Sequence, residues 1–267
     1  MTEWSRKLIG SSGYDRAGFA EGYDRHRPRP PDALLETLCR YARVERPALV
    51  VDLGCGTGLS TRAWSGRADR IVGVEPNPAM LAASAEAPGV EYREAFAQAT
   101  GLEDGVADIV TCSQSLHWMD PQPTFTEAAR VLRPGGVFAA YDYDWPPVID
   151  PEVDEAYDAY QWRRGEMRRN RGIQRGGDRW DKSSHLQRMR ESGLFRFCRE
   201  ILLHSIEEGN ADRVVGFAYS LGLPAALDDP ELETELRVAE LEEVARRVLG
   251  DRTVPFLFGY RVRAGVR

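Results

Sequence analysis

The chain has 267 residues, 42% of them hydrophobic, which suits one large α/β domain or one domain with an insertion. Its formal net charge of −7 repels phosphate backbones, so no nucleic-acid partner is expected. No apolar run reaches the length of a bilayer span and no charged-then-apolar leader opens the sequence, which predicts a soluble, cytoplasmic protein with no membrane partner. The four cysteines and four histidines are scattered, so neither a disulfide framework nor a metal site is expected.

Strands and helices alternate through the first half of the chain. Apolar, β-branched runs predict buried parallel strands. Asp32 and Asn77 are expected to cap two of the helices between them. The predicted strands cover residues 48–53, 70–75, 90–94, 108–112 and 137–141, and the predicted helices cover residues 32–41, 77–81 and 124–132. This alternation favours an α/β fold with a doubly wound, mostly parallel sheet.

The composition changes beyond Trp145, where arginine, tyrosine and tryptophan become frequent. This part predicts a helical insertion or lid between the fifth and sixth strands. Strands over residues 195–206 and 254–262, expected to lie side by side, and helices over residues 210–221 and 231–249 complete a seven-stranded, Rossmann-like sheet. The predicted segments are an N-terminal helical cap (1–46), a ligand-binding core (47–145), the insertion or lid (146–193) and a C-terminal part that completes the sheet (194–267).

The strongest motif is the loop Val50-Val-Asp-Leu-Gly-Cys-Gly-Thr-Gly-Leu-Ser-Thr61. Its three glycines turn sharply from a strand into a helix, and their missing Cβ atoms are expected to let a ligand lie against the backbone. The spacing G-x-G-x-G differs from the G-x-G-x-x-G of dinucleotide-binding folds. The loop also lacks the Lys and Ser/Thr that end a phosphate-binding P-loop.

This loop resembles the first motif of class I S-adenosylmethionine-dependent methyltransferases, and further similarity follows in chain order. Glu75 ends the second strand, where the family's acidic residue binds both ribose hydroxyls; a carboxylate suits a vicinal diol because it has two acceptor oxygens. Leu132-Arg-Pro-Gly-Gly136 resembles the family's turn before the fifth strand. The resemblance covers residues 19–145 and is nearest to the small-molecule branch that includes trans-aconitate methyltransferase-like proteins.

The resemblance implies S-adenosylmethionine as cofactor and a small molecule as substrate. It also implies that Tyr23 and Arg27 contact the methionine carboxylate of the cofactor. Phe96 and Ala97 are expected to contact the adenine, although the family often has an acidic residue at the position of Phe96. The segment Ser113–Asp120 resembles the one that lines the methionine end. The predicted cofactor-binding residues are Tyr23, Arg27, Asp52, Gly54, Cys55, Gly56, Glu75, Pro76, Met80, Phe96, Ala97, Ser113, Gln114 and His117.

The activated methyl group of a sulfonium needs positioning more than covalent help, so orientation is expected to dominate catalysis. An amine or alcohol acceptor would need a proton acceptor, for which His117, Asp142 and Asp144 are candidates. His117 and Tyr143 are the predicted catalytic residues, and Tyr141, Tyr143 and Trp145 are expected to share one side of a strand as an aromatic wall around the substrate.

Between Gln161 and Lys182, eight basic side chains outnumber three acidic ones. Such a run is typical of a solvated helix face, but it also suits a lid that binds a carboxylate-bearing substrate, with Arg168 and Arg171 as candidates. Three alternatives to methyl transfer stay open: another reaction of S-adenosylmethionine, such as intramolecular cyclisation or aminocarboxypropyl transfer; a nicotinamide-dependent oxidoreductase; and a non-catalytic cofactor-binding protein.

Overall fold

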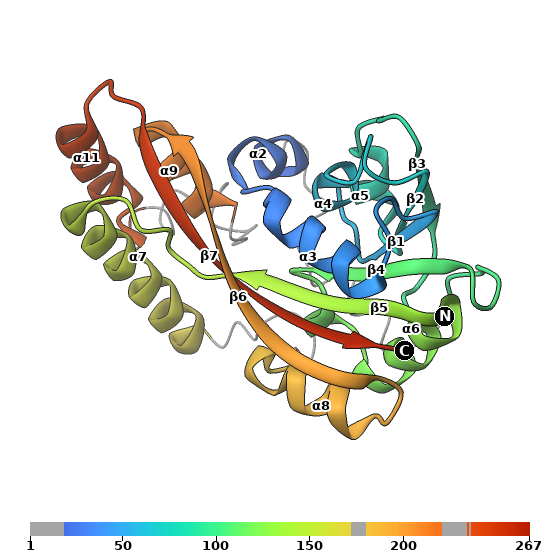
Figure 1. Ribbon diagram of the computed structural model, residues 1–267. Coiled ribbons are helices and arrows are strands. Elements are labelled where there is room, and N and C mark those ends of the chain that lie inside the picture. The colour runs from blue at the N-terminus through green and yellow to red at the C-terminus, as the bar shows by residue number, and fades with distance from the viewer. Residues whose placement is uncertain (1–18, 172–179, 221–233, 235) are drawn as a thin grey trace. The chain divides into compact units, whose positions relative to one another are not determined.

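A computed structural model of the chain describes residues 19–171, 180–220, 234 and 236–267. Seven strands form one sheet in the order β3-β2-β1-β4-β5-β7-β6 (Figure 1). The strands are β1 (Leu49–Leu53), β2 (Arg70–Glu75), β3 (Val90–Glu94), β4 (Ala107–Ser113), β5 (Leu132–Tyr143), β6 (Arg196–Gly209) and β7 (Val254–Val266). The first five pair in parallel, whereas β7 pairs antiparallel with β5. This is the predicted fold class: a Rossmann-like sheet with its helical insertion between β5 and β6.

The described helices connect these strands. They are α2 (Phe19–His26), α3 (Asp32–Ala42), α4 (Leu59–Arg62), α5 (Pro78–Ala82), α6 (Pro121–Val131), α7 (Pro151–Asn170), α8 (His185–Glu191), α9 (Ala211–Tyr219) and α11 (Val238–Leu249), with short 3₁₀ turns η1 (Leu116–Trp118) and η2 (Lys182–Ser184). The predicted cap at Asn77 is confirmed, because its side chain accepts a hydrogen bond from the Ala79 N–H. Parts of the predicted helices 210–221 and 231–249 lie outside the described residues.

Two details of the sequence prediction were wrong. Pro31, and not Asp32, precedes α3 as its N-cap residue; Asp32 begins the helix and pairs with Arg67 (2.7 Å). The Pro134-Gly-Gly136 stretch was expected to be a turn before the fifth strand, but it belongs to β5 itself. The strand accommodates it because its register against β4 shifts between Ala107 and Ile109.

Residue contacts divide the chain into two compact units. Unit 2 comprises residues 29–143, 178–203 and 260–267, and unit 1 comprises residues 1–28, 144–177 and 204–259. The insertion thus contributes to both units, as do the long strands β6 and β7. The four segments expected from the sequence remain a prediction about domain organisation.

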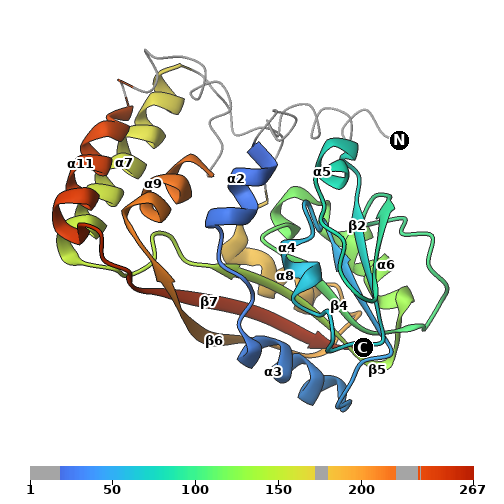
Figure 2. The ribbon, with the colours of Figure 1, turned by 90° about the horizontal axis from the view of Figure 1, so that it is seen from above.

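Unit 2 holds the parallel strands and covers them on both faces. Every residue of β1 is buried, as expected for a central strand of a doubly wound sheet. Leu34, Leu35 and Leu38 of α3 are buried, and Figure 2 shows this helix on one face of the strands with α6 and α8 on the other. On the latter face Phe125 of α6 and Phe195 pack against Phe138 of β5, with ring centroids 5.6 and 5.3 Å from that of Phe138.

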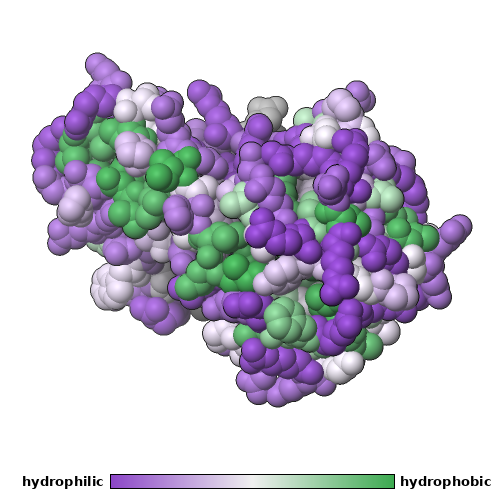
Figure 3. All heavy atoms as spheres, in the orientation of Figure 1, coloured by the Kyte–Doolittle hydropathy of each residue, from purple (hydrophilic) through white to green (hydrophobic). Residues whose placement is uncertain are grey.

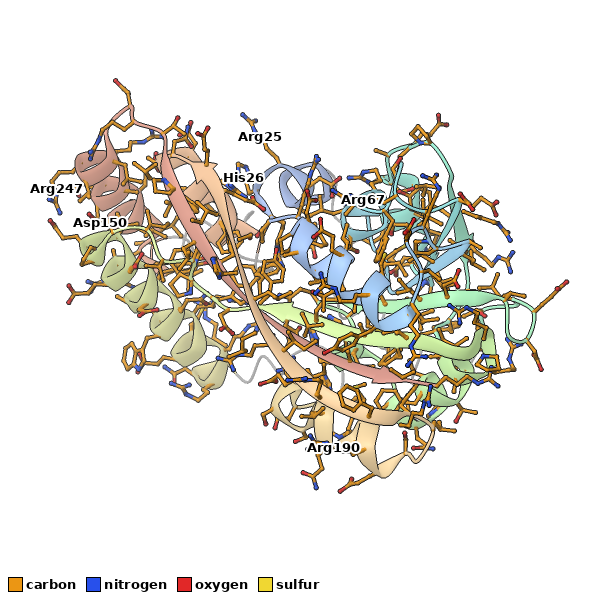
Figure 4. All side chains as sticks on the ribbon, viewed as in Figure 1. Arg25, His26, Arg67, Asp150, Arg190 and Arg247 are labelled. Atoms are coloured by element: carbon orange, nitrogen blue, oxygen red, sulfur yellow. The ribbon has the colours of Figure 1, made fainter. Side chains whose placement is uncertain are left out.

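Unit 1 contains α2, α7, α9 and α11. Helices α7 and α9 both pack against α11 (Figure 2). Arg247 of α11 pairs with Glu152 in the first turn of α7 (2.8 Å). Asp150 is the N-cap residue of α7, and Figure 4 shows Asp150 and Arg247 at the same end of these two helices. The helices of this unit are therefore held together by apolar packing supplemented by surface charge pairs.

Strand β6 stands at the edge of the sheet and alternates between exposed and half-buried residues. Leu202 and Ile206 are among its exposed apolar side chains. The surface drawn in Figure 3 is mainly hydrophilic, with hydrophobic side chains gathered in separate patches. In the part of the chain that the structure describes, no helix combines the length and apolar character needed to cross a membrane.

Candidate functional site

The glycine-rich loop between β1 and α4 turns through three left-handed residues in unit 2. Gly54, Gly56 and Gly58 have φ values of 66°, 57° and 79°, which residues with a Cβ rarely adopt. A Cβ on Gly54 would lie 2.5 Å from Met119 Cε, and one on Gly58 would overlap the Tyr92 hydroxyl. Besides the sharp turn and the ligand approach expected from the sequence, the glycines therefore make room for protein side chains.

Glu75 meets this loop from the end of β2. Its Oε2 accepts a hydrogen bond from the Gly56 N–H and its Oε1 accepts one from the Asn77 N–H, each at 3.0 Å. Burial raises the pKa of the Glu75 carboxyl above its usual value, while the two N–H donors oppose that shift. Each oxygen retains a lone pair for a second donor, so the carboxylate can still accept from two neighbouring hydroxyl groups.

Asp52 lies beneath the loop at the end of β1 and is 1% exposed. Its carboxylate accepts hydrogen bonds from the hydroxyls of Ser60 (2.6 Å), Thr61 (2.8 Å) and Thr111 (2.9 Å). Burial raises the pKa of this carboxyl, and the three hydroxyl donors lower it. These bonds join β1, α4 and β4, which makes Asp52 a residue that orders the loop.

Residues expected at the adenine and methionine ends follow β3 and β4, whose carboxyl ends lie at the same edge of the parallel sheet as that of β1. Phe96 and Ala97 come after β3; Ser113 ends β4 and Gln114 follows it. His117 is 8% exposed in η1, and its ring centroid lies 5.4 Å from that of Trp118. In an open α/β sheet this edge is where ligands bind.

Cys55 and Met80 complete the surroundings of the loop. Burial raises the pKa of the Cys55 thiol well above its usual value, so the thiol stays protonated at neutral pH and is a poor nucleophile. Met80 is 4% exposed, and its Cε lies 3.1 Å from the position that a Cβ on Gly56 would take. Pro76 directly follows Glu75 and precedes the cap residue of α5.

The predicted aromatic wall divides between the two units. Tyr141 is 1% and Tyr143 is 6% exposed, and the ring of Tyr143 packs edge-on against Tyr260 at 5.8 Å. Trp145 lies beyond the end of β5 and belongs to unit 1, where it stacks on Phe217 at 4.1 Å. The strand alternation that grouped the three aromatic residues therefore stops at Tyr143.

Tyr23 and Arg27, predicted to bind the methionine carboxylate, meet Trp145 within unit 1. The Arg27 guanidinium lies over both rings, 4.3 Å from the Tyr23 centroid and 4.5 Å from that of Trp145. Its Nε donates to Ser220 Oγ (3.0 Å) and its Nη2 to the Ser220 carbonyl oxygen (2.5 Å). Arg27 thus has a packing role in this unit, and its contact with the cofactor remains a prediction.

Sequence reasoning did not single out several residues beside the site. Ser115 donates to the Leu53 carbonyl oxygen (2.7 Å), and its Cβ lies 2.8 Å from the position of a Gly54 Cβ. The Trp180 N–H donates to the His117 carbonyl oxygen (2.9 Å), and the Lys182 ammonium donates to the Gln114 side chain (2.6 Å). Trp180 and Lys182 lie far along the chain from β4, so only the fold brings them there.

The Asp142 carboxylate, a candidate base, is held by two cations. It pairs with Lys182 (2.6 Å) and with the buried Arg263 (2.8 Å). These ion pairs occupy both of its oxygens, so Asp142 is a structural ion-pair partner here and a weak candidate for proton abstraction. Among the residues that the structure describes, no group of three or more His, Cys, Asp or Glu side chains is arranged to hold a metal ion.

Comparison with known proteins agrees with this geometry. Residues 51–140 match the family model described as the methyltransferase domain. Residues 51–140 therefore form a methyltransferase domain, and the sheet is the Rossmann-like fold of class I S-adenosylmethionine-dependent methyltransferases, whose cofactor is S-adenosylmethionine.

Individual relatives cover different shares of the chain. A Mycobacterium tuberculosis protein named an uncharacterized methyltransferase is 40% identical over 122 residues, which are 45% of this chain and 48% of that protein. A structure from Anaeromyxobacter dehalogenans, provisionally assigned as a type II methyltransferase, is 27% identical with a TM-score of 0.68, covering 90% of this chain and 97% of that one. The chain spans about half the length of the curated relatives it matches.

Proposed function

We propose that the protein transfers the methyl group of S-adenosylmethionine to a small molecule. The observation that carries this proposal is the Glu75 carboxylate at the end of β2, which is bonded to the Gly56 N–H and faces the left-handed glycine loop. A carboxylate with one backbone donor on each oxygen is fixed in orientation, which suits binding of the two hydroxyls of a ribose. The net charge of −7 supports a small-molecule acceptor over a nucleic acid.

When bound, the sulfonium of the cofactor supplies an activated methyl group. The chain's own residues have three tasks: to hold the adenosyl and methionine parts, to orient the acceptor in line with the methyl group, and to exclude water. We assign the first task to Glu75, the glycine loop, Phe96 and Ala97. Within the same proposal, Tyr23 and Arg27 bind the methionine carboxylate.

The acceptor side of the proposed site begins at the segment after β4. Ser113, Gln114 and His117 lie at the carboxyl ends of β4 and β5, together with Tyr141 and Tyr143. For an amine or alcohol acceptor, we assign proton abstraction to His117. Tyr143 is proposed to orient the acceptor, because its ring is already held by packing against Tyr260.

The direct test is to incubate the protein with methyl-labelled S-adenosylmethionine and a bacterial metabolite extract, and to identify both products. Methyl transfer yields S-adenosylhomocysteine and a labelled metabolite. Formation of methylthioadenosine instead would indicate aminocarboxypropyl transfer or cyclisation. Calorimetric titration with S-adenosylhomocysteine and with NADH separates the proposal from an oxidoreductase, and absence of saturable S-adenosylhomocysteine binding would contradict the proposal.

We further propose that the acceptor bears a carboxylate, which the basic end of α7 recruits. Arg168 lies in the last turn of this helix and Arg171 directly follows it. Arginine binds carboxylates through two parallel donors, and a positive patch also speeds encounter with an anion. Reversing both charges (Arg168→Glu, Arg171→Glu) is expected to raise the KM for the acceptor about tenfold or more, with little change in KM for the cofactor.

The control for this variant is Arg196→Glu, an exposed charge on β6. Steady-state kinetics at several salt concentrations measure both effects, because recruitment by charge weakens as ionic strength rises. An unchanged KM for the acceptor in the double variant would reject the carboxylate preference and leave methyl transfer itself untouched.

A further inference from the structure

The segment that leads into α8 is attached to the proposed site by a lysine. In unit 2, Lys182 Nζ lies 2.6 Å from Gln114 Oε1 and 2.6 Å from Asp142 Oδ1. The same segment makes a second attachment two residues earlier, where the Trp180 N–H donates to the His117 carbonyl oxygen (2.9 Å). Residues 180–182 are therefore attached to the segment after β4 at two points, both among residues proposed to face the acceptor.

The Lys182 ammonium ends a row of ion-paired side chains that includes Asp142 and Arg263. Asp142, its partner, also accepts from Arg263 Nη1 (2.8 Å), and Arg263 Nε donates to Glu200 (3.0 Å). Asp142 and Arg263 are 7% and 4% exposed, so the middle of this row of alternating charges is buried. Arg261 Nη1 lies 3.9 Å from the other oxygen of Glu200, so both carboxylates of the row are held between cations. The physical effect of the row is to fix the position of the lysine.

Gln114 is the residue that this lysine holds. Its φ of 52° places it in the left-handed region, which is unfavourable for a residue with a side chain. The backbone N–H of Gln114 donates to the Tyr141 carbonyl oxygen (2.9 Å), and its side-chain amide donates to the Tyr143 carbonyl oxygen (3.2 Å). With Lys182 on the amide oxygen, the Gln114 side chain is held at both ends.

Ser115, the residue after Gln114, contacts the glycine-rich loop that follows β1. Ser115 Oγ donates to the Leu53 carbonyl oxygen (2.7 Å), and Ser115 Cβ lies 2.8 Å from the position of a Gly54 Cβ. A displacement of Gln114 is therefore transmitted through packed atoms to the glycine loop. An unbroken chain of contacts thus links Lys182, Gln114, Ser115 and Gly54.

The choice of lysine at this position stands out from the composition. Of the 35 basic residues in the chain, only Lys7 and Lys182 are lysines. A lysine ammonium is a compact group whose three donors point in different directions, so it can serve a carboxylate and an amide oxygen on different elements. The planar fork of an arginine is matched to two acceptors in one plane, such as the oxygens of a single carboxylate.

We propose that Lys182 is a positioning residue for methyl transfer: it holds Gln114, and with it the segment from Ser113 to His117, in the arrangement in which the acceptor meets the methyl group. This inference rests on the proposed function. Lys182 acts through Gln114 and makes no covalent change itself. Its removal is therefore expected to slow the reaction while the cofactor still binds.

The first experiment uses the scarcity of lysine in the full chain. Protein grown with lysine labelled with ¹³C at Cε gives side-chain NMR signals from Lys7 and Lys182, assigned with Lys182→Arg. Adding S-adenosylhomocysteine is expected to shift the Lys182 signal and to leave that of Lys7 in place, because Lys182 is linked through Gln114 to the cofactor loop. Saturating binding with an unmoved Lys182 signal would contradict the proposal.

The second experiment compares three variants in the label-transfer assay, with the labelled acceptor isolated in the test above. Lys182→Met is expected to lower kcat about 10- to 100-fold, since a displacement near 1 Å can have such an effect. Its dissociation constant for S-adenosylhomocysteine should change less than about threefold. The control Arg190→Met removes an exposed cation from α8 (Figure 4) and is expected to keep the wild-type rate.

Lys182→Arg separates positioning from simple charge pairing. It keeps a cation beside Asp142, so its thermal stability should equal that of the wild type, yet its kcat should stay at least about fivefold low. Full recovery of kcat in Lys182→Arg, or a Lys182→Met rate equal to that of Arg190→Met, would overturn the assignment. If the wild-type protein does not bind S-adenosylhomocysteine, that result would instead refute the proposed function.

Discussion

Replacing Glu75 with alanine is expected to weaken S-adenosylhomocysteine binding at least about 100-fold. The carboxylate would form two charge-assisted hydrogen bonds with the ribose, each contributing about 1.5–3 kcal/mol, and each factor of ten corresponds to about 1.4 kcal/mol. Isothermal titration calorimetry measures the change directly. Glu36→Ala, which removes an exposed carboxylate from α3, serves as a control and is expected to bind within about threefold of the wild type.

The pH dependence of the same binding tests the protonation state of Glu75. Burial raises the pKa of this carboxyl above 4.5, so its oxygens begin to be protonated at a higher pH than those of an exposed glutamate. Affinity for S-adenosylhomocysteine is therefore expected to be constant near neutrality and to fall as the pH drops through the raised pKa. Glu75→Gln, which lacks this titration, should bind more weakly with a flatter profile between about pH 7 and pH 4.5; identical profiles would rule out Glu75 as the titrating group.

Acid is expected to destabilise the fold through His185, by about 3 kcal/mol between pH 6.5 and pH 4. This side chain is fully buried at the start of α8, and neither ring nitrogen has a hydrogen-bond partner within the described residues. Desolvation lowers the pKa of His185 to about 4 from 6.5; Arg263, Arg188 and Lys182 act in the same direction, and Asp142 opposes them.

The sign follows from which state binds more protons. Between pH 6.5 and pH 4 the unfolded chain carries a proton on His185 and the folded chain does not, so stability falls as the pH is lowered through this range. His185→Leu removes the titration, and its free energy of unfolding should depend less on pH by about 3 kcal/mol over the same range. Urea denaturation at a series of pH values measures both proteins. Parallel curves would show that His185 is not the responsible group, because contributions from buried carboxyls such as Asp52 cancel in the difference.

The cofactor side of the site was largely predictable from sequence because its residues are consecutive along the chain. Three glycines after a buried strand and an acidic residue at the end of the next strand need only local geometry and parallel pairing to come together. Asp52 was expected to order the loop, and its three hydroxyl partners give it that position. For Gly54 and Gly58 the prediction was incomplete, since Met119, Ser115 and Tyr92 fill the space beside them.

The acceptor side was much less predictable, because long-range packing places its residues. Alternation grouped Tyr141, Tyr143 and Trp145, but the strand ends at Tyr143, and Trp145 packs in the other unit against Phe217. Asp142 was a candidate base until two cations, one from β7 and one from η2, were found beside it. In the sequence, Lys182 differs little from the seven other basic residues between Gln161 and itself.

The sequence by itself determined the class of the core: buried β-branched runs, the glycine loop and the acidic residue after β2 are local patterns, and local patterns survive any arrangement of the rest of the chain. The tertiary structure decided which distant side chains meet those patterns. Lys182 and Arg263 lie far along the chain from Asp142 and Gln114, and no spacing in the sequence encodes their contacts. Those contacts form because β7 inserts antiparallel beside β5 and because residues 180–182 are attached over the end of β4.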